Sequence, residues 1–241
     1  MSAVSARIVD VDLENFHRIP GACRATLYWE MDHDDPEVNP RFQKEEWFSS
    51  TLLEWGSCGK LVVSDDDPAA IPASHPEGPG RVAPRQAAVI DHPSSAGRGG
   101  SVRADADDGA GFAEYAPATL FPRLRRFPTG IAATTSDTVY LAYCYVIEGR
   151  RGQGLGSALV REVARAAVDR GYRAIEALGD RAWDGGWVIP VSFLAANGFT
   201  VVRDDERFPL LRLDLHSRDE LLSQRERAAV PVSDAAASEA Y

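Results

Sequence analysis

Apolar residues along this chain of 241 residues recur in two patterns, and each predicts secondary structure. Short apolar runs bounded by Gly, Pro, Asn or Asp predict strands over residues 6–11, 61–63, 112–116, 139–146, 174–177, 199–203 and 210–215. Apolar residues three or four positions apart predict one helix from Asn39-Pro40 to Gly56 and another that ends at Gly171. A shorter helix is expected from Asp12 to Phe16, with the Asp12 side chain as its cap.

The strand over residues 139–146 runs into a glycine-rich turn that opens the next helix. The amides at a helix start have no intrahelical partner and lie at the positive end of the helix dipole. They can therefore bind an anionic pyrophosphate without any side chain. Three glycines, Gly152, Gly154 and Gly156, let the main chain come close to such a ligand. The turn predicts a phosphate-binding site.

Spacing separates the families of glycine-rich loop. A Walker loop needs a Lys and a Ser or Thr after its last glycine, whereas Gly156 is followed by Ser157 and Ala158. A dinucleotide fingerprint that begins at Gly154 finds Leu159 in place of its third glycine. Glu176, about 20 residues further on, fits the acid that binds the ribose in that fold. A nucleotide-binding oxidoreductase therefore stays open as an alternative.

Two segments together carry a more specific resemblance. Arg151, Gly154 and Gly156 form the pattern Arg-x-x-Gly-x-Gly, and about 40 residues later the segment 191–199 reads as a helix that ends in a Gly-Phe pair. In this order they resemble the acyl-CoA pyrophosphate loop and the late helix of the GCN5-related N-acetyltransferase (GNAT) superfamily. The resemblance runs from about Gly111 to Leu215 and is fainter over the first 63 residues.

The resemblance implies an α/β fold with a mixed, mostly antiparallel sheet of six to seven strands, helices on both faces and a splay between the two central strands. We expect a single domain over residues 1–216. Residues 64–108 are rich in Pro, Gly, Ala, Ser and Asp without any period, so they predict a disordered insertion, with a lid over the site as the alternative. Residues 217–241 predict a flexible tail.

The resemblance also implies an activity: an N-acetyltransferase that moves an acetyl group from acetyl-CoA to a primary amine by direct attack. The acceptor is a small molecule or a peptide whose identity the sequence leaves open. The alternative is a weakly active or inactive acyl-CoA-binding module with a regulatory role. The residues expected to bind the CoA moiety are Tyr145, Val146, Ile147, Arg151, Gly152, Gln153, Gly154, Leu155, Gly156 and Ser157.

The chain departs from the family at the general acid. That acid is a tyrosine on the late helix, and the matching position here is Leu194 or Phe193, neither of which can donate a proton. Tyr143 and Tyr145 are the remaining candidates. Strand alternation places both on one face with Leu141, and places Tyr140, Ala142 and Cys144 on the other.

The general base is also missing from its expected place. Because alternation puts no carboxylate near the reacting groups on the strand, Glu30 and Glu176 are the candidates by analogy. No metal is expected, since the three cysteines and the histidines form no ligand spacing.

Charge and composition limit the partners. The net charge of −10 and a pI of about 5.0 argue against nucleic acid and anionic membranes. No apolar run reaches the roughly 20 residues that span a bilayer, and the widely spaced cysteines suggest a reducing compartment, so we expect a cytoplasmic protein. An arginine-rich chain with only two lysines suggests a bacterial source. The oligomeric state stays open, with a homodimer as one option.

Overall fold

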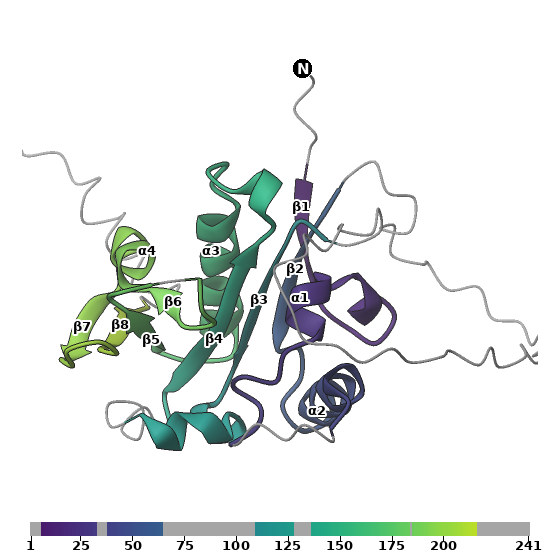
Figure 1. Ribbon diagram of the computed structural model, residues 1–241, viewed down its shortest axis with the longest axis horizontal. Coiled ribbons are helices and arrows are strands. Elements are labelled where there is room, and N and C mark those ends of the chain that lie inside the picture. The colour runs from purple at the N-terminus through teal and green to yellow at the C-terminus, as the bar shows by residue number, and fades with distance from the viewer. Residues whose placement is uncertain (1–5, 33–37, 65–108, 128–135, 184, 216–241) are drawn as a thin grey trace, which may run out of the picture.

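The computed structural model describes residues 6–32, 38–64, 109–127, 136–183 and 185–215 (Figure 1). They form one eight-stranded sheet in the order β1-β2-β3-β4-β5-β8-β7, with β6 beside β5. The strands are β1 (Ala6–Asp10), β2 (Gly59–Ser64), β3 (Gly111–Ala116), β4 (Thr138–Val146), β5 (Ala174–Asp180), β6 (Ile189–Pro190), β7 (Thr200–Arg203) and β8 (Leu210–Asp214). The seven predicted strands are all present, and only the two-residue β6 was missed.

All neighbouring strands pair antiparallel except β4 with β5 and β5 with β6. The prediction of a mixed, mostly antiparallel sheet is confirmed. Dinucleotide-binding domains instead use a mostly parallel, doubly wound sheet. The topology therefore removes the oxidoreductase alternative that the turn sequence had left open.

The sheet forks between its two central strands. β4 and β5 pair only at Thr138 with Ala174, Val139 with Ile175 and Tyr140 with Glu176. Beyond these pairs β4 continues to Val146, while β5 continues beside β8. The predicted splay is confirmed, and it leaves one edge of the second half of β4 without a strand partner.

Helices cover both faces of the sheet (Figure 1). α1 (Gly21–Arg24) and α2 (Pro40–Glu54) lie on one face, and α3 (Leu155–Asp169) and α4 (Val191–Ala196) lie on the other. Asn39 caps α2 as expected, because its side chain accepts hydrogen bonds from the amides of Arg41 and Phe42. Single 3₁₀ turns are η1 (Phe16–Arg18), η3 (Ala118–Leu120), η4 (Pro122–Arg126) and η6 (Glu148–Arg150).

The helix expected from Asp12 to Phe16 is absent. Asp12 Oδ1 accepts hydrogen bonds from the amides of Glu14 and Asn15, as a cap would. The chain nevertheless forms only a turn followed by η1, because Asn15 also bonds back to Asp10 and fixes a tight reversal after β1.

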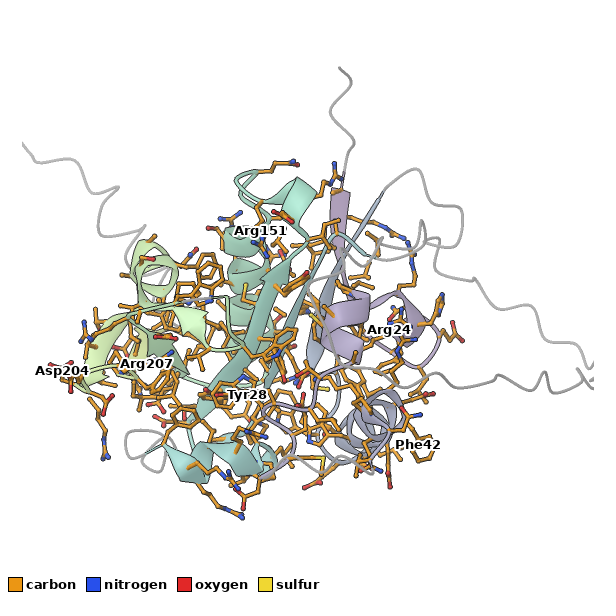
Figure 2. All side chains as sticks on the ribbon, in the orientation of Figure 1. Arg24, Tyr28, Phe42, Arg151, Asp204 and Arg207 are labelled. Carbon is orange, nitrogen blue, oxygen red and sulfur yellow. The ribbon has the colours of Figure 1, made fainter. Side chains whose placement is uncertain are left out.

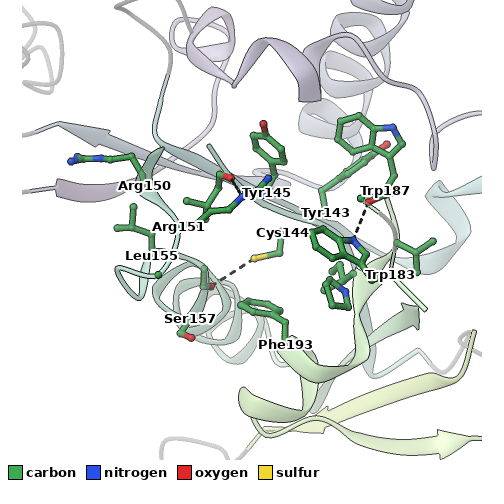
Figure 3. A pocket seen from close by; sticks show the side chains of 18 of the residues that line it. Tyr143, Cys144, Tyr145, Arg150, Arg151, Leu155, Ser157, Trp183, Trp187 and Phe193 are labelled. Carbon is green, nitrogen blue, oxygen red and sulfur yellow. Dashed lines mark hydrogen bonds between the residues drawn. The ribbon is translucent and has the colours of Figure 1, made fainter. Parts of the chain in front are cut away.

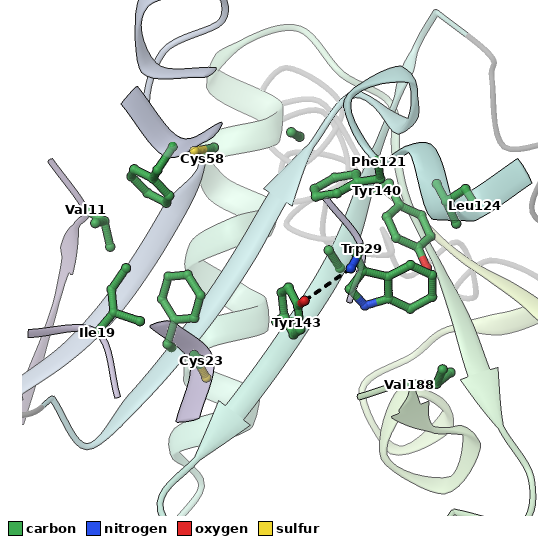
Figure 4. Close-up of a cluster of buried hydrophobic side chains, with 14 of the residues drawn as sticks. Val11, Ile19, Cys23, Trp29, Cys58, Phe121, Leu124, Tyr140, Tyr143 and Val188 are labelled. Atoms are coloured by element: carbon green, nitrogen blue, oxygen red, sulfur yellow. Dashed lines mark hydrogen bonds between the residues drawn. The ribbon is translucent and has the colours of Figure 1, made fainter. Parts of the chain in front are cut away.

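Two apolar cores lie on the two faces of the sheet. The first packs Trp29 against Tyr140 of β4 (Figure 4) and includes Phe48 of α2, and the second packs Leu159 and Val163 of α3 against the opposite face. Burial of each such side chain stabilises the fold by about 1.5–3 kcal/mol. Charged side chains such as Asp204 and Arg207 lie at the periphery (Figure 2).

The expected insertion and tail fall almost wholly outside the described residues, so both stay predictions. The described chain places β2 and β3, which flank the insertion, side by side as an antiparallel pair. Within the described residues, no helix has the length and apolar character needed to cross a membrane.

Candidate active site

A bulge interrupts β4 near its middle. On the partner strand, Glu114 lies opposite Tyr143, while its neighbour Tyr115 lies opposite Leu141. Ala142 is thus one residue more than β3 can pair with, which is the definition of a β-bulge. Such an extra residue changes which way the following side chains point.

The bulge overturns the expected faces of β4. Leu141 packs in the core beside α3, whereas Tyr143 and Tyr145 pack on the opposite side of the sheet, together with Tyr140. The prediction that Leu141 shares a face with Tyr143 and Tyr145 was wrong. It assumed unbroken alternation, and the bulge moves the alternation by one residue.

The glycine-rich turn presents a row of unpaired amides. Gly152 and Gly154 take positive φ angles of 74° and 78°, a backbone conformation that favours glycine. The first amide to bond into α3 is that of Ala158, which donates to the Gly154 carbonyl at 3.0 Å. No protein acceptor in the described part of the chain pairs with the amides of residues 152–157. Together with the helix dipole they form an anion-binding nest.

These amides open onto a cleft of about 440 Å³. It lies between β4 and the segment that follows β5, with the turn at one end and the two tryptophans Trp183 and Trp187 at the other (Figure 3). The lining residues are Tyr143, Cys144, Tyr145, Val146, Arg150, Arg151, Gly152, Gly154, Leu155, Gly156, Ser157, Trp183, Gly185, Gly186, Trp187, Val188, Ile189, Pro190 and Phe193. All the residues expected to bind CoA are among them except Ile147 and Gln153.

Ile147 has no main-chain group to offer a ligand. Its amide donates to the Ala110 carbonyl at 3.1 Å, and its carbonyl accepts from the Arg150 amide at 3.0 Å. Because main-chain groups alternate in direction along a strand, Tyr145 also points its groups toward β3, and Val146 points its own into the fork. The main chain of Ile147 is therefore already paired, whereas Val146 lines the cleft.

Gly156 serves packing between helices rather than close approach to a ligand. A Cβ atom at this position would lie 2.9 Å from the ring of Phe193 on α4. By contrast, a Cβ at Gly152 or Gly154 would meet nothing within 4 Å. Two of the three glycines thus face open space at the cleft, and the third lets α3 and α4 touch.

Arg151 fixes the turn to the strand that precedes it. Its Nε donates to the Val146 carbonyl at 3.0 Å, and its guanidinium carbon lies 6.0 Å from the centroid of the Tyr145 ring. Among the described residues, Arg151 forms no ion pair with a carboxylate. Its positive charge is available to an anion at the turn.

The two candidate tyrosines differ in their surroundings. The Tyr143 hydroxyl donates to Glu30 Oε2 at 3.1 Å and accepts from the Trp29 amide at 3.3 Å. Burial, followed by the charges of Glu30 and Glu114, holds the pKa of Tyr143 well above its usual value. Tyr145 is partly exposed at the cleft, and burial is the main cause of its raised pKa. Both phenols therefore keep their protons at neutral pH.

On the late helix, neither residue at the family's general-acid position can donate a proton. Leu194 is fully buried in the core, and Phe193 lines the cleft with its ring. The other predicted base, Glu176, is bound to Arg212 at 3.2 Å and does not line the cleft. Of the predicted acid and base residues, Glu30 and Tyr143 are in contact, and Tyr145 lines the same cleft as Tyr143.

Sequence reasoning missed two charged residues beneath the cleft. Lys44 of α2 forms ion pairs with Glu30 and with Glu114 of β3, the latter at 2.7 Å, and all three side chains are at most 1% exposed. A signal was present in the sequence: Lys44 lies four residues before Phe48, on the apolar face of its helix. Glu114 likewise interrupts an apolar strand.

Residues 73–184 match the model of the acetyltransferase (GNAT) family. Over this segment, a little under half of the chain, the protein is similar to the GNAT acetyltransferases. The matched residues include the forked strands β4 and β5, the nest and α3. The match begins inside the segment 65–108, which lies outside the described residues.

The GNAT fold recurs among solved structures. A candidate acetyltransferase from Acinetobacter baylyi ADP1 superposes with a TM-score of 0.50 at 14% identity, covering 90% of this chain and 96% of that one. An acetyltransferase structure from Salmonella typhimurium with its cofactor acetyl-CoA gives a TM-score of 0.48 at 13% identity, covering 88% and 95%. An N-acetyltransferase from Staphylococcus aureus Mu50 gives 0.49 at 14% identity, covering 88% and 99%. No curated protein matches the sequence.

Proposed function

We propose that this protein transfers an acetyl group from acetyl-CoA to a primary amine by direct attack. The observation that carries the proposal is the row of unpaired amides at residues 152–157, which opens onto a cleft in the fork of the sheet. Residues 155–157 are half-buried and residues 152–154 are exposed, and unpaired amides at a helix start that open onto a cleft are suited to bind an anionic ligand.

The cleft fits the parts of acetyl-CoA in order. The nest suits the diphosphate, and the Arg151 guanidinium adds positive charge beside it. The unpaired edge of β4 suits the pantetheine arm, which would lie along Val146 like an added strand. Apart from Arg150, the rest of the described cleft wall is mostly apolar or aromatic, including Trp187 and Phe193, and none of the described lining residues is acidic.

The chemistry needs a polarised carbonyl and a proton for the leaving thiolate. An amide that points into the fork, as that of Val146 does, stabilises negative charge on the thioester oxygen, and such stabilisation is usually what accelerates acyl transfer most. Tyr145 is the better proton donor to the thiolate, because the Tyr143 proton is already donated to Glu30. A raised pKa keeps Tyr145 protonated and able to donate at neutral pH.

Binding and turnover are tested separately. Isothermal calorimetry is expected to show binding of CoA and acetyl-CoA but not of NAD. Release of free thiol in the presence of a panel of amines, including alkylamines, aminoglycosides and peptides, is expected for at least one acceptor. Binding of acetyl-CoA with no thiol release on the whole panel would favour the acyl-CoA-binding module. Failure to bind CoA would reject both.

A further inference from the structure

A buried group of charged residues reaches the cleft through Tyr143. It joins the chain beside α1 (Glu30), α2 (Lys44), β3 (Glu114) and β4 (Tyr143), so elements distant in the sequence each supply one member. We call these four residues the buried cluster. Moving even one ion from water into a protein interior costs several kcal/mol, so a desolvated group of this kind calls for an explanation.

The charges of the buried cluster do not balance when all its carboxyls are ionised. One ammonium faces two carboxylates, and the side chains of all three are 0–1% exposed. Glu114 Oε2 lies 2.7 Å from Lys44 Nζ, yet neither oxygen of Glu114 accepts a hydrogen bond of good geometry in the described structure. An unbalanced buried charge is normally removed by protonation. The two carboxyls and Lys44 therefore titrate as a unit, and the form with both carboxyls ionised favours the uptake of one proton.

Among the described residues, the other ionisable groups around the buried cluster do not supply this charge. Cys23 of α1 and Cys58 next to β2 face it, and burial is the main cause that raises the pKa of each thiol, so both stay neutral. For Glu114 burial likewise raises the pKa, and Glu30 adds to this while Lys44 opposes it. For Lys44 the two carboxylates outweigh burial, which alone would lower the pKa, and Lys44 stays charged.

Tyr143 connects the buried cluster to the cleft. It lines the cleft, donates its proton to Glu30 and accepts one hydrogen bond from the Trp29 amide. A phenol oxygen has a second lone pair, so it can accept one more proton. The cleft wall contains no carboxylate among the described residues, and an acceptor ammonium must lose a proton before its nitrogen can attack.

We propose that Glu30, Lys44 and Glu114 form one proton-accepting unit that acts through the Tyr143 hydroxyl on the acceptor amine. This proposal rests on the function proposed above. As the ammonium N–H bond breaks, its proton moves to Tyr143 Oη, and the Tyr143 proton moves to Glu30 Oε2. The nitrogen keeps the electron pair with which it attacks the thioester. Tyr143 touches the substrate, and the other three are positioning residues.

Two substitutions test the unit because they must act in opposite directions. Glu114→Gln removes the like charge beside Glu30, so the acidic limb of the kcat profile should move to lower pH, by about one unit or more. Lys44→Met removes the compensating cation, so the same limb should move to higher pH. Glu30→Gln should lower kcat about 100-fold while the CoA dissociation constant stays within about twofold of the wild-type value.

Glu176→Gln is the matched control, because Glu176 is a buried carboxyl bound to Arg212, outside the cleft. It should leave the pH profile in place. Shifts of the limb in the same direction for Glu114→Gln and Lys44→Met, or no shift in Glu114→Gln, would overturn the proposal. If Lys44→Met fails to fold, Glu114→Gln and Glu30→Gln still test the proposal. A merely structural role of Glu114 predicts that the acidic limb of the kcat profile does not move to lower pH in Glu114→Gln.

A second readout does not depend on turnover. In wild-type protein, infrared spectra recorded across a pH titration should show the carbonyl stretch of a protonated buried carboxyl. This band should persist at pH values where free carboxyls are already ionised and should disappear only at higher pH. In Glu114→Gln that band should titrate at lower pH, and in Glu176→Gln it should stay. Absence of the band in wild-type protein would reject the proton-accepting unit. Its presence without thiol release on any amine would leave the unit standing and reject the transferase.

Discussion

At the residue scale, the nest depends on glycines whose backbone is left-handed. Gly154 has a φ angle of 78° and open space where a Cβ would stand, so a side chain there is strained and also fills the space that the ligand needs. Gly171 has nearly the same conformation, with a φ angle of 82° and nothing within 4 Å, but lies at the far end of α3. Substitutions at the two positions therefore distinguish the effect of backbone strain from the effect of blocking the ligand.

Gly154→Val is therefore expected to abolish CoA binding, measured by calorimetry, while the protein stays folded. Its backbone strain should cost about 1–3 kcal/mol of unfolding free energy, and Gly171→Val should cost a similar amount. Only the first variant should lose CoA. Wild-type affinity in Gly154→Val, or loss of affinity in both variants, would contradict the assignment of the nest.

The assignment of the general acid makes a second prediction for single residues. Of the two tyrosines that line the cleft among the described residues, Tyr143 donates its proton to Glu30 and Tyr145 does not. Tyr145→Phe should therefore lower kcat at least tenfold and leave the CoA dissociation constant unchanged. Steady-state kinetics at several pH values measure this. Tyr172→Phe, at a hydroxyl that accepts a hydrogen bond from Trp55, serves as the control. An undiminished kcat in Tyr145→Phe would mean that solvent protonates the thiolate.

The sequence predicted the nest residues better than the buried cluster, for a physical reason. Amides at a helix start act through the backbone, so a local glycine pattern is enough to locate them. The pairing of Lys44 with Glu30 and Glu114 arises only when three separate elements pack together. No local pattern contains that information, although a lysine on an apolar helix face could have raised the question.

At the scale of elements, the sequence predicted where β4 begins and ends but not which way its side chains point. Period-2 alternation assumes a regular ladder, and the pairing of β3 with β4 shifts by one residue at Ala142. The shift depends on the partner strand, so it cannot be read from β4 alone. Because it follows Leu141, it moves the two candidate tyrosines, Tyr143 and Tyr145, to the other face.

The contact between α3 and α4 makes a prediction at the same scale. Gly156→Ala places a methyl group 2.9 Å from the Phe193 ring and should lower the free energy of unfolding by about 1–3 kcal/mol. Phe193→Leu should relieve part of this, so that the double variant is more stable than the sum of the single effects predicts. Urea unfolding of the four proteins measures the coupling. Strict additivity would show that the two helices do not meet at this point.

At the scale of the whole molecule, the resemblance predicted the fold, and composition predicted an insertion that lies outside the described residues. The forked, mostly antiparallel sheet with helices on both faces followed from two motifs, and the pairing confirms it. The role of residues 65–108 does not follow in the same way, since composition reports only the lack of a period. The family match begins at residue 73, inside this segment.

Replacing residues 65–108 with a linker of about five Gly and Ser residues tests whether this segment is an insertion or a part of the fold. Val62 lies opposite Gly111 in an antiparallel pair, so Ser64 and Gly109 end side by side, and a hairpin loop of that length can join them. If the segment only closes a long loop, shortening it should raise the free energy of unfolding by about 2 kcal/mol and leave CoA affinity intact. If residues 73–108 belong to the domain core, the variant should unfold several degrees earlier in thermal melts. If they instead cover the cleft, the free energy of unfolding should stay unchanged while CoA affinity or kcat changes. A lid acts on binding and turnover and not on the two cores on the faces of the sheet.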